Sequence, residues 1–207
     1  MRRIFTLAVA TAVMLSLAAS PAAAQSSAVD EATLMPQLDP SFSWSCRDTG
    51  GGPICHGSGG EMSYANVDIG IACAGQPVYL TGSGVAHQTR WHLPDGRATK
   101  MITNLRVTDH FSLSPVGEGP RVTAQSRWNR HSTYLEPGDS STRVLTEIGA
   151  VYHATAPGYG LLFHDVGLIR FAPGQPFEEI TEMHGPHDLY SSGFADLEVA
   201  VCEVLTS

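Results

Sequence analysis

Lysine is almost missing from this chain, because Lys100 stands alone beside eleven arginines. The sequence also lacks a C-x-x-C pair, a phosphate-binding Gly-rich loop followed by Lys-Ser or Lys-Thr, and a G-x-S-x-G hydrolase elbow. After residue 24, no apolar run approaches the ~18 residues that a transmembrane helix needs. These absences argue against a cysteine-held zinc site, a P-loop nucleotide site, a serine hydrolase and a membrane-spanning helix, and no residue pattern announces a reaction.

The first 24 residues have the anatomy of an export signal. Arg2 and Arg3 form a short positive segment, residues 4–17 are mostly apolar, and three alanines precede Gln25 as an A-x-A-type cleavage site. The paired arginines also suggest a twin-arginine signal, but the very short polar region favours the general secretory route. We therefore predict a secreted, extracellular or cell-envelope protein, in a compartment where thiols pair.

The charge of the predicted mature chain argues against nucleic-acid partners. Without the signal it carries 10 basic and 20 acidic residues, a net charge of −10 with neutral histidines. Proteins that hold polyanions concentrate lysine and arginine on one face. Here the arginines are scattered singly along the sequence, so we expect neither nucleic-acid nor polyanion binding.

Composition divides the rest of the chain into two parts. Residues 25–43 are rich in small and polar residues with little periodicity, which predicts a flexible N-terminal segment. Residues 44–207 are long enough for a single domain with its own core.

Within that domain the hydrophobic period is typical of strands. Val85, His87, Thr89, Trp91 and Leu93 alternate with other residues before the turn at 94–96. Strands are also predicted at Leu105–Leu113, Val122–Tyr134, Val144–Tyr152, Leu161–Phe171, Phe177–Met183 and Leu197–Leu205. No long helix is predicted.

Many short strands joined by Gly and Pro turns predict an all-β fold. We favour an antiparallel β-barrel, because a closed meander of hairpins removes exposed sheet edges. A β-sandwich is the alternative, since alternation does not fix connectivity.

The four cysteines predict two disulfides that staple the fold. Three connectivities are possible. Loop geometry favours Cys46 with Cys55, across a turn-forming stretch, and Cys73 with Cys202, across most of the domain. A loop that long would contribute roughly 4 to 5 kcal/mol in the chain-entropy picture.

Residues 184–188 form the most suggestive polar cluster. His184, His187 and Asp188 lie within five residues on a loop that Pro186 stiffens, so they are the one alternative for a metal site. A polar Gly-Pro turn that simply faces water is the simpler reading, and we predict no metal and no cofactor.

His164 and Asp165 are the candidate catalytic residues. Adjacent strand residues point to opposite faces, so one of the two must point inward. If Asp165 shares a face with Leu161, Phe163, Ile169 and Phe171, it needs a partner for its charge. Arg90, Arg127 and Arg143 are the expected partners for a structural role, and a general acid is the other interpretation.

The chain as a whole resembles secreted, β-rich proteins of unknown function from high-GC Gram-positive bacteria. The resemblance rests on the signal, Trp44-Ser45-Cys46, the segment 90–96, the strand within 160–167, and Cys202 with Leu205. It implies a small barrel-like fold and supplies no catalytic residues.

Three functions follow from these observations. The first is a non-enzymatic β-barrel that binds a small apolar ligand or an envelope component. Its candidate ligand-binding residues, chosen by position, are Arg90, Trp91, Trp128 and Tyr152. The second is a structural or protein-interaction domain, which needs an exposed apolar patch. The third is a barrel enzyme, a cyclase, isomerase or hydrolase, whose histidines and acids must converge on one cavity.

Overall fold

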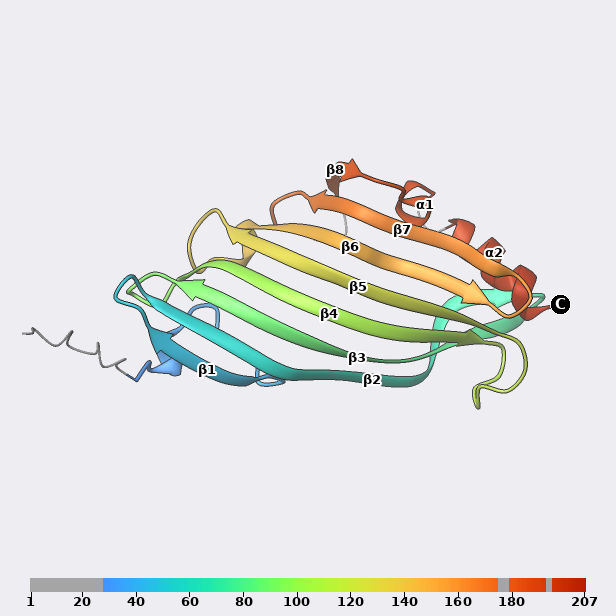
Figure 1. Cartoon of the computed structure of the whole chain (residues 1–207), viewed down its shortest axis with the longest axis horizontal. Helices are drawn as coiled ribbons and strands as arrows, with labels where there is room; N and C mark the ends of the chain where they lie inside the picture. The colour runs from blue at the N-terminus through green and yellow to red at the C-terminus, as the bar shows by residue number, and fades with distance from the viewer. Residues whose placement is uncertain (1–27, 175–178, 193–194) are drawn as a thin grey trace, which may run out of the picture.

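A single antiparallel sheet dominates the computed structural model, which describes residues 28–174, 179–192 and 195–207. Eight strands follow one another in chain order, each paired with the next (Figure 1). The predicted export signal lies outside the described residues. The strands are β1 (Ser43–Asp48), β2 (Pro53–Cys73), β3 (Gln76–His92), β4 (Ala98–Ser112), β5 (Arg121–Tyr134), β6 (Arg143–Ala156), β7 (Gly160–Phe171) and β8 (Ile180–His184).

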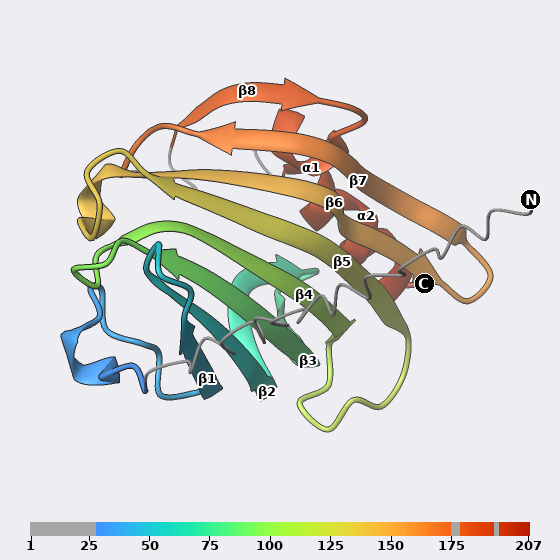
Figure 2. The same ribbon diagram turned by 60° about the vertical axis from the view of Figure 1, so that its left-hand side comes forward.

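The sheet is open, so the prediction of a closed barrel is wrong. In the described part of the chain, β1 pairs with β2 and β8 pairs with β7, and no pairing joins β1 to β8. Figure 2 shows the sheet as a strongly curved surface with its first and last strands apart. Both edge strands are short, so an open sheet leaves few unpaired backbone N–H and C=O groups at its edges.

The C-terminal segment is helical, which corrects the predicted strand at Leu197–Leu205. Helix α2 (Ala195–Leu205) follows the one-turn helix α1 (Asp188–Ser191). Val201, Val204 and Leu205 are buried while Val199 is exposed, so the apolar residues form a helical stripe rather than the two-residue alternation of a strand. Every helix in the described residues is too short or too polar to cross a bilayer.

The helix α2 packs against one face of the sheet, which we call the inner face. Its buried residues meet Val122, Ala124 and Phe163 in the main core. Successive side chains along a strand point to opposite faces of the sheet, so every second residue lies on an outer face that α2 does not cover. On β4, for example, Leu105 is buried on the inner face and Arg106 is exposed on the outer face.

Both predicted disulfides are present. Cys46 bonds to Cys55 across the β1–β2 turn, and Cys73 at the end of β2 bonds to Cys202 in α2. The second bond spans 129 residues and ties α2 to the core, where Cys73 is buried. All four cysteines of the chain are therefore paired.

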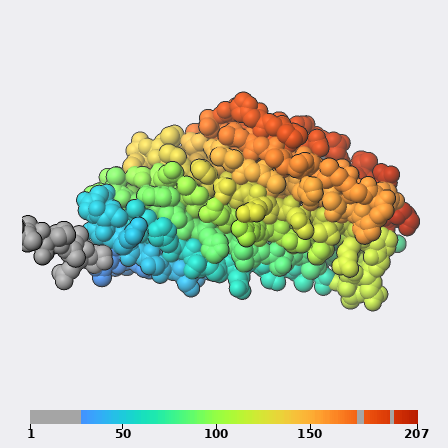
Figure 3. Space-filling view, viewed as in Figure 1, coloured from blue at the N-terminus to red at the C-terminus, as the bar shows by residue number. Residues whose placement is uncertain are grey.

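Residues 28–42, which precede β1, lie against the opposite end of the sheet from α2 (Figure 1). Leu34 is fully buried after the short 3-10 helix η1 (Glu31–Thr33), and Met35 pairs with Arg97 beside the β3–β4 turn. Figure 3 shows the β4–β5 turn, residues 113–120, projecting at the far end of the molecule. The inner face is thus covered by α2 at one end and by the N-terminal residues at the other.

Candidate functional site: the inner pocket

A cavity of about 350 Å³ lies on the inner face beneath residues 39–42. We call it the inner pocket. Strands β2 to β6 supply its walls, and its volume is within the range of small-molecule sites. Its lining residues are Asp39, Ser41, Phe42, Gly60, Glu61, Met62, Ala86, Gln88, Met101, Thr103, Leu105, Arg130, Ser132, Arg143 and Leu145.

Two buried polar atoms that line the inner pocket have no hydrogen-bond partner. They are the Oγ of Ser132, whose side chain is fully buried, and the Nε of Arg143. The strand register brings them together, since Ser132 pairs with Leu145, two residues from Arg143 on the same face of β6. Buried polar atoms are almost always hydrogen-bonded, so a pair of them in one cavity is the pattern expected of a ligand site.

Three other polar side chains in or beside the pocket already have hydrogen-bond partners. Gln88 Nε2 donates to Thr103 Oγ1 at 3.0 Å, and Arg90 Nε donates to Gln88 Oε1 at 2.6 Å. Arg90 also donates to the carbonyls of Pro36 and Gln37, which fixes the N-terminal residues on the sheet. Ser132 and Arg143 each offer a polar group of a ligand one buried atom that has no hydrogen-bond partner in the protein.

Two arginines, Arg143 in the pocket lining and Arg90 beside it, lie close to each other. Burial lowers the pKa of Arg90. Tyr134 and Asp39 oppose this shift, and the positive charge of Arg143 lowers the pKa further, so the guanidinium groups of Arg90 and Arg143 interact. The ion pairs formed by the described residues do not include Arg143. An anion at this position would relieve the repulsion between the two cations.

The third arginine, Arg130, has its own acid. Its Nε donates to the buried Glu147 at 2.6 Å, and Glu147 also accepts from Trp128 Nε1 at 3.2 Å and Tyr190 Oη at 3.4 Å. The Arg130 guanidinium lies 5.4 Å from the Trp128 ring centre. This network fixes one wall of the pocket.

Aromatic rings cover the inner pocket from the N-terminal side. Phe42 packs against Gly60, where any side chain would overlap its ring, and Trp44 packs in the same way on Gly57. Arg90 lies 5.2 Å from the Trp44 ring centre. The apolar walls Met62, Met101, Leu105 and Leu145 lie below this cover and offer contacts to a hydrocarbon group.

A second polar pair lies further along the inner face. Tyr64 Oη donates to the buried carboxylate of Asp109, and Gly82 leaves room for both side chains. Burial raises the pKa of Asp109, and the hydrogen bond from Tyr64 opposes that shift. The folded state therefore holds this proton more tightly than the unfolded chain does.

We predict that Asp109 makes the fold less stable as pH rises. Above the ordinary value of 3.8 the unfolded chain loses the proton first, so the free energy of unfolding falls through the range between 3.8 and the raised pKa. Urea unfolding of the wild type and Asp109→Asn from about pH 3 to pH 7 measures this, because the variant has no proton to lose there. The free energy of unfolding of the wild type relative to that of Asp109→Asn should fall as pH rises. A relative free energy that rises instead would show that folding lowers the pKa of Asp109.

Asp165 lies on the inner face among the apolar residues of β7, fully buried. Its partner is a histidine rather than the arginines expected from the sequence. Its Oδ1 lies 2.7 Å from His187 Nδ1, and its Oδ2 accepts from the Leu189 backbone N–H at 2.8 Å. His187 Nε2 lies 2.9 Å from the carbonyl of His184. Both ring nitrogens lie within hydrogen-bonding distance of an oxygen atom, and the group anchors α1 to β7.

The structure separates the two candidate catalytic residues. His164 lies on the outer face, beside His153 with ring centres 5.1 Å apart, whereas Asp165 points inward to His187. They do not converge on one cavity, as the enzyme hypothesis required. Of the alternative metal ligands, His187 bonds to Asp165 and His184 bonds to Glu182. Among the described residues, no three His, Cys, Asp or Glu side chains gather to hold a metal ion.

The candidate ligand-binding residues are also divided between faces. Arg90 lies on the inner face next to the pocket, whereas Trp128 is outside the pocket lining and donates to Glu147, the acid that pairs with Arg130. Tyr152 is on the inner face too, where burial raises its pKa, and Asp109 and Glu147 raise it further. Trp91 is on the outer face, under the ammonium group of Lys100. Ser132 had no sequence signal, because its importance depends on which strand lies beside it.

Comparison with known proteins gave no matching family model, and neither the curated proteins nor the solved structures gave a significant match. The site is therefore interpreted from its own geometry.

Proposed function

We propose that this protein is a non-enzymatic binding domain that holds a small amphiphile in the inner pocket. The ligand has an apolar chain or ring and one anionic group, such as a carboxylate. The observation that carries the proposal is the pair of unpartnered buried atoms, Ser132 Oγ and Arg143 Nε, in the lining of one cavity. The resemblance to secreted bacterial proteins stays a prediction, and two disulfides support an oxidising compartment.

The chemistry of the pocket sets the orientation of the ligand. The carboxylate accepts from Arg143 and from the Ser132 hydroxyl, while the apolar part lies against Met62, Met101 and Leu105. This satisfies both orphan donors and removes hydrocarbon from water. The ligand enters past Phe42, because on this side the pocket is covered by the segment 39–42 and not by strands of the sheet.

A protein-interaction role has weaker support. That hypothesis needs a contiguous apolar patch, but the exposed large apolar side chains are scattered over different elements, for example Val85 on β3, Leu161 on β7 and Val199 on α2.

Octanoate and octanol test the proposal, since they share an apolar chain and differ in charge. We expect calorimetry of the mature protein to show octanoate binding about tenfold or more tightly than octanol, the effect of charged hydrogen bonds. Arg143→Met should remove that preference and leave octanol binding unchanged. Ser132→Ala should weaken octanoate binding less and leave the fold intact, because it removes a buried hydroxyl without a partner.

Arg121→Met is the matched control, because Arg121 is an exposed arginine outside the inner pocket. Equal affinities for octanoate and octanol, or an octanoate affinity unaffected by Arg143→Met, would contradict the proposal.

A further inference from the structure

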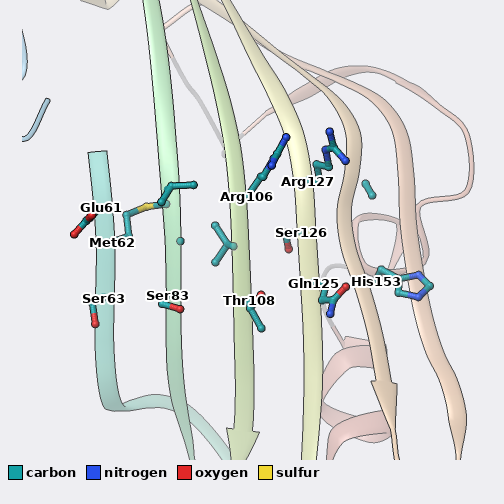
Figure 4. Close-up of a pocket in the computed structure, with 14 residues that line it drawn as sticks. Glu61, Met62, Ser63, Ser83, Arg106, Thr108, Gln125, Ser126, Arg127 and His153 are labelled. Carbon is teal, nitrogen blue, oxygen red and sulfur yellow. The ribbon is translucent and has the colours of Figure 1, made fainter. Parts of the chain in front are cut away.

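Two arginines lie side by side on the outer face of the sheet. Arg106 on β4 pairs directly with Arg127 on β5, and both are exposed. Figure 4 shows their side chains next to one another on adjacent strands. Like charges directly opposite each other on a sheet are destabilising, so this pair costs stability unless an anion joins it.

In the described part of the sheet no acid lies directly beside the two arginines, although Glu61 lines the same hollow. The flanking strands place Val85 beside Arg106 and Ala150 beside Arg127. Residues two positions away along β4 and β5 are also uncharged: Asn104, Thr108, Gln125 and Asn129. Glu61 shares the row but lies two strands from Arg106, and the ion pairs of the described residues include neither arginine.

The arginine pair is shared by two adjoining hollows. One, of about 700 Å³, is lined by residues of β2 to β6, and the other, of about 460 Å³, by residues of β3 to β5. We call them together the outer groove. Five adjacent strands span about 20 Å, so the groove is long enough for an extended chain rather than a single ion.

The side chains around the pair are suited to hydroxyl groups. Figure 4 shows a row across the strands beyond the arginines, formed by Ser63, Ser83, Thr108, Gln125 and His153. His87, Asn104 and Asn129 lie on the other side of the pair. Hydroxyl, amide and imidazole groups both donate and accept, which matches sugar hydroxyls.

We propose that the outer groove binds an acidic polysaccharide, with a carboxylate or sulfate group on Arg106 and Arg127 and neighbouring sugar hydroxyls on the flanking polar row. Planar guanidinium groups bind both anions through paired hydrogen bonds. The site is separate from the inner pocket, on the opposite face of the sheet. This proposal departs from the sequence-based expectation of no polyanion binding, which rested on arginines scattered singly along the chain. The β4–β5 register brings two of them together, so the ligand is held at this one pair of cations rather than along a basic surface.

The test uses oligogalacturonate as the carboxylate probe, a heparin oligosaccharide as the sulfate probe and a neutral dextran oligomer of equal length. We expect calorimetry to show binding of one or both acidic probes and none of the neutral one. Arg127→Gln should weaken that binding about tenfold or more, the loss expected for a charged contact. The acidic probe that binds more tightly identifies the anion.

Arg121→Gln is the matched control. It removes the same charge from the same face of the same strand, outside both hollows, and should leave affinity unchanged. Arg143→Met, in the inner pocket, should also leave affinity unchanged. The proposal is overturned if neither acidic probe binds, if the control variants lose as much affinity as Arg127→Gln, or if single-stranded DNA binds more tightly than both glycans.

Discussion

Removing the long-range disulfide, by replacing Cys73 and Cys202 with serine, is expected to lower the free energy of unfolding by about 5 kcal/mol. The bond joins residues 129 positions apart, so the unfolded chain gains a large conformational freedom when the bond is lost. It also holds α2 against the inner face, where Cys73 lies in the main core. A loss of this size is a large part of the stability of an ordinary domain.

The second disulfide provides the matched comparison. Cys46 and Cys55 are only nine positions apart, and the same chain-entropy relation predicts a loss of about 2.5 kcal/mol when both are replaced by serine. Urea unfolding of the two double variants measures the difference directly. Equal losses would show that loop length does not set the contribution of these bonds, and a larger loss for the β1–β2 bond would contradict the account.

Asp165→Asn is expected to lower the free energy of unfolding by about 3 to 5 kcal/mol, because it breaks a fully buried Asp–His pair and leaves His187 without its carboxylate partner. Both side chains of the pair are fully buried, and Asp165 also accepts a hydrogen bond from the backbone N–H of Leu189 in α1. Hydrogen exchange should therefore rise first around α1. The C-terminal helix would follow, since α1 contacts α2.

An exposed ion pair supplies the control for this variant. Arg97 and Asp95 form a salt bridge with both side chains about half exposed, so Arg97→Gln should lower the free energy of unfolding far less than Asp165→Asn does. Replacing Asp165 and His187 together by leucine should recover part of the lost stability, because no buried charge then lacks a partner. An Asp165→Asn variant that unfolds as late as Arg97→Gln would refute a stabilising role for the buried pair.

The local features of this fold could be predicted from the sequence, because each depends on neighbouring residues. Alternation around Trp91 and Ile169 marks strands, Gly and Pro residues mark the turns, and the cysteine spacing favoured the pairs that form. The C-terminal helix was missed because Leu197, Val199 and Val201 imitate a strand, while the stripe that continues to Val204 and Leu205 has the helical period.

The sites depend on register, which local patterns do not determine. Arg106 and Arg127 are scattered singly in the sequence and become neighbours only when β4 pairs with β5. In the same way, Ser132 and Arg143 meet because β5 and β6 align at Leu145. Barrel closure depends on curvature and strand length over the whole sheet, so alternation within single strands gave no information about it.

The inner pocket is the centre of this account, and a crystal structure of the mature protein soaked with 8-bromooctanoate tests it most directly. Anomalous scattering from bromine locates the apolar end of the probe, and the electron density locates its carboxylate. We predict the carboxylate within hydrogen-bonding distance of Ser132 Oγ and Arg143, with bromine against Met62, Met101 or Leu105. An inner pocket that contains only water, with the probe bound elsewhere, would contradict the proposed function.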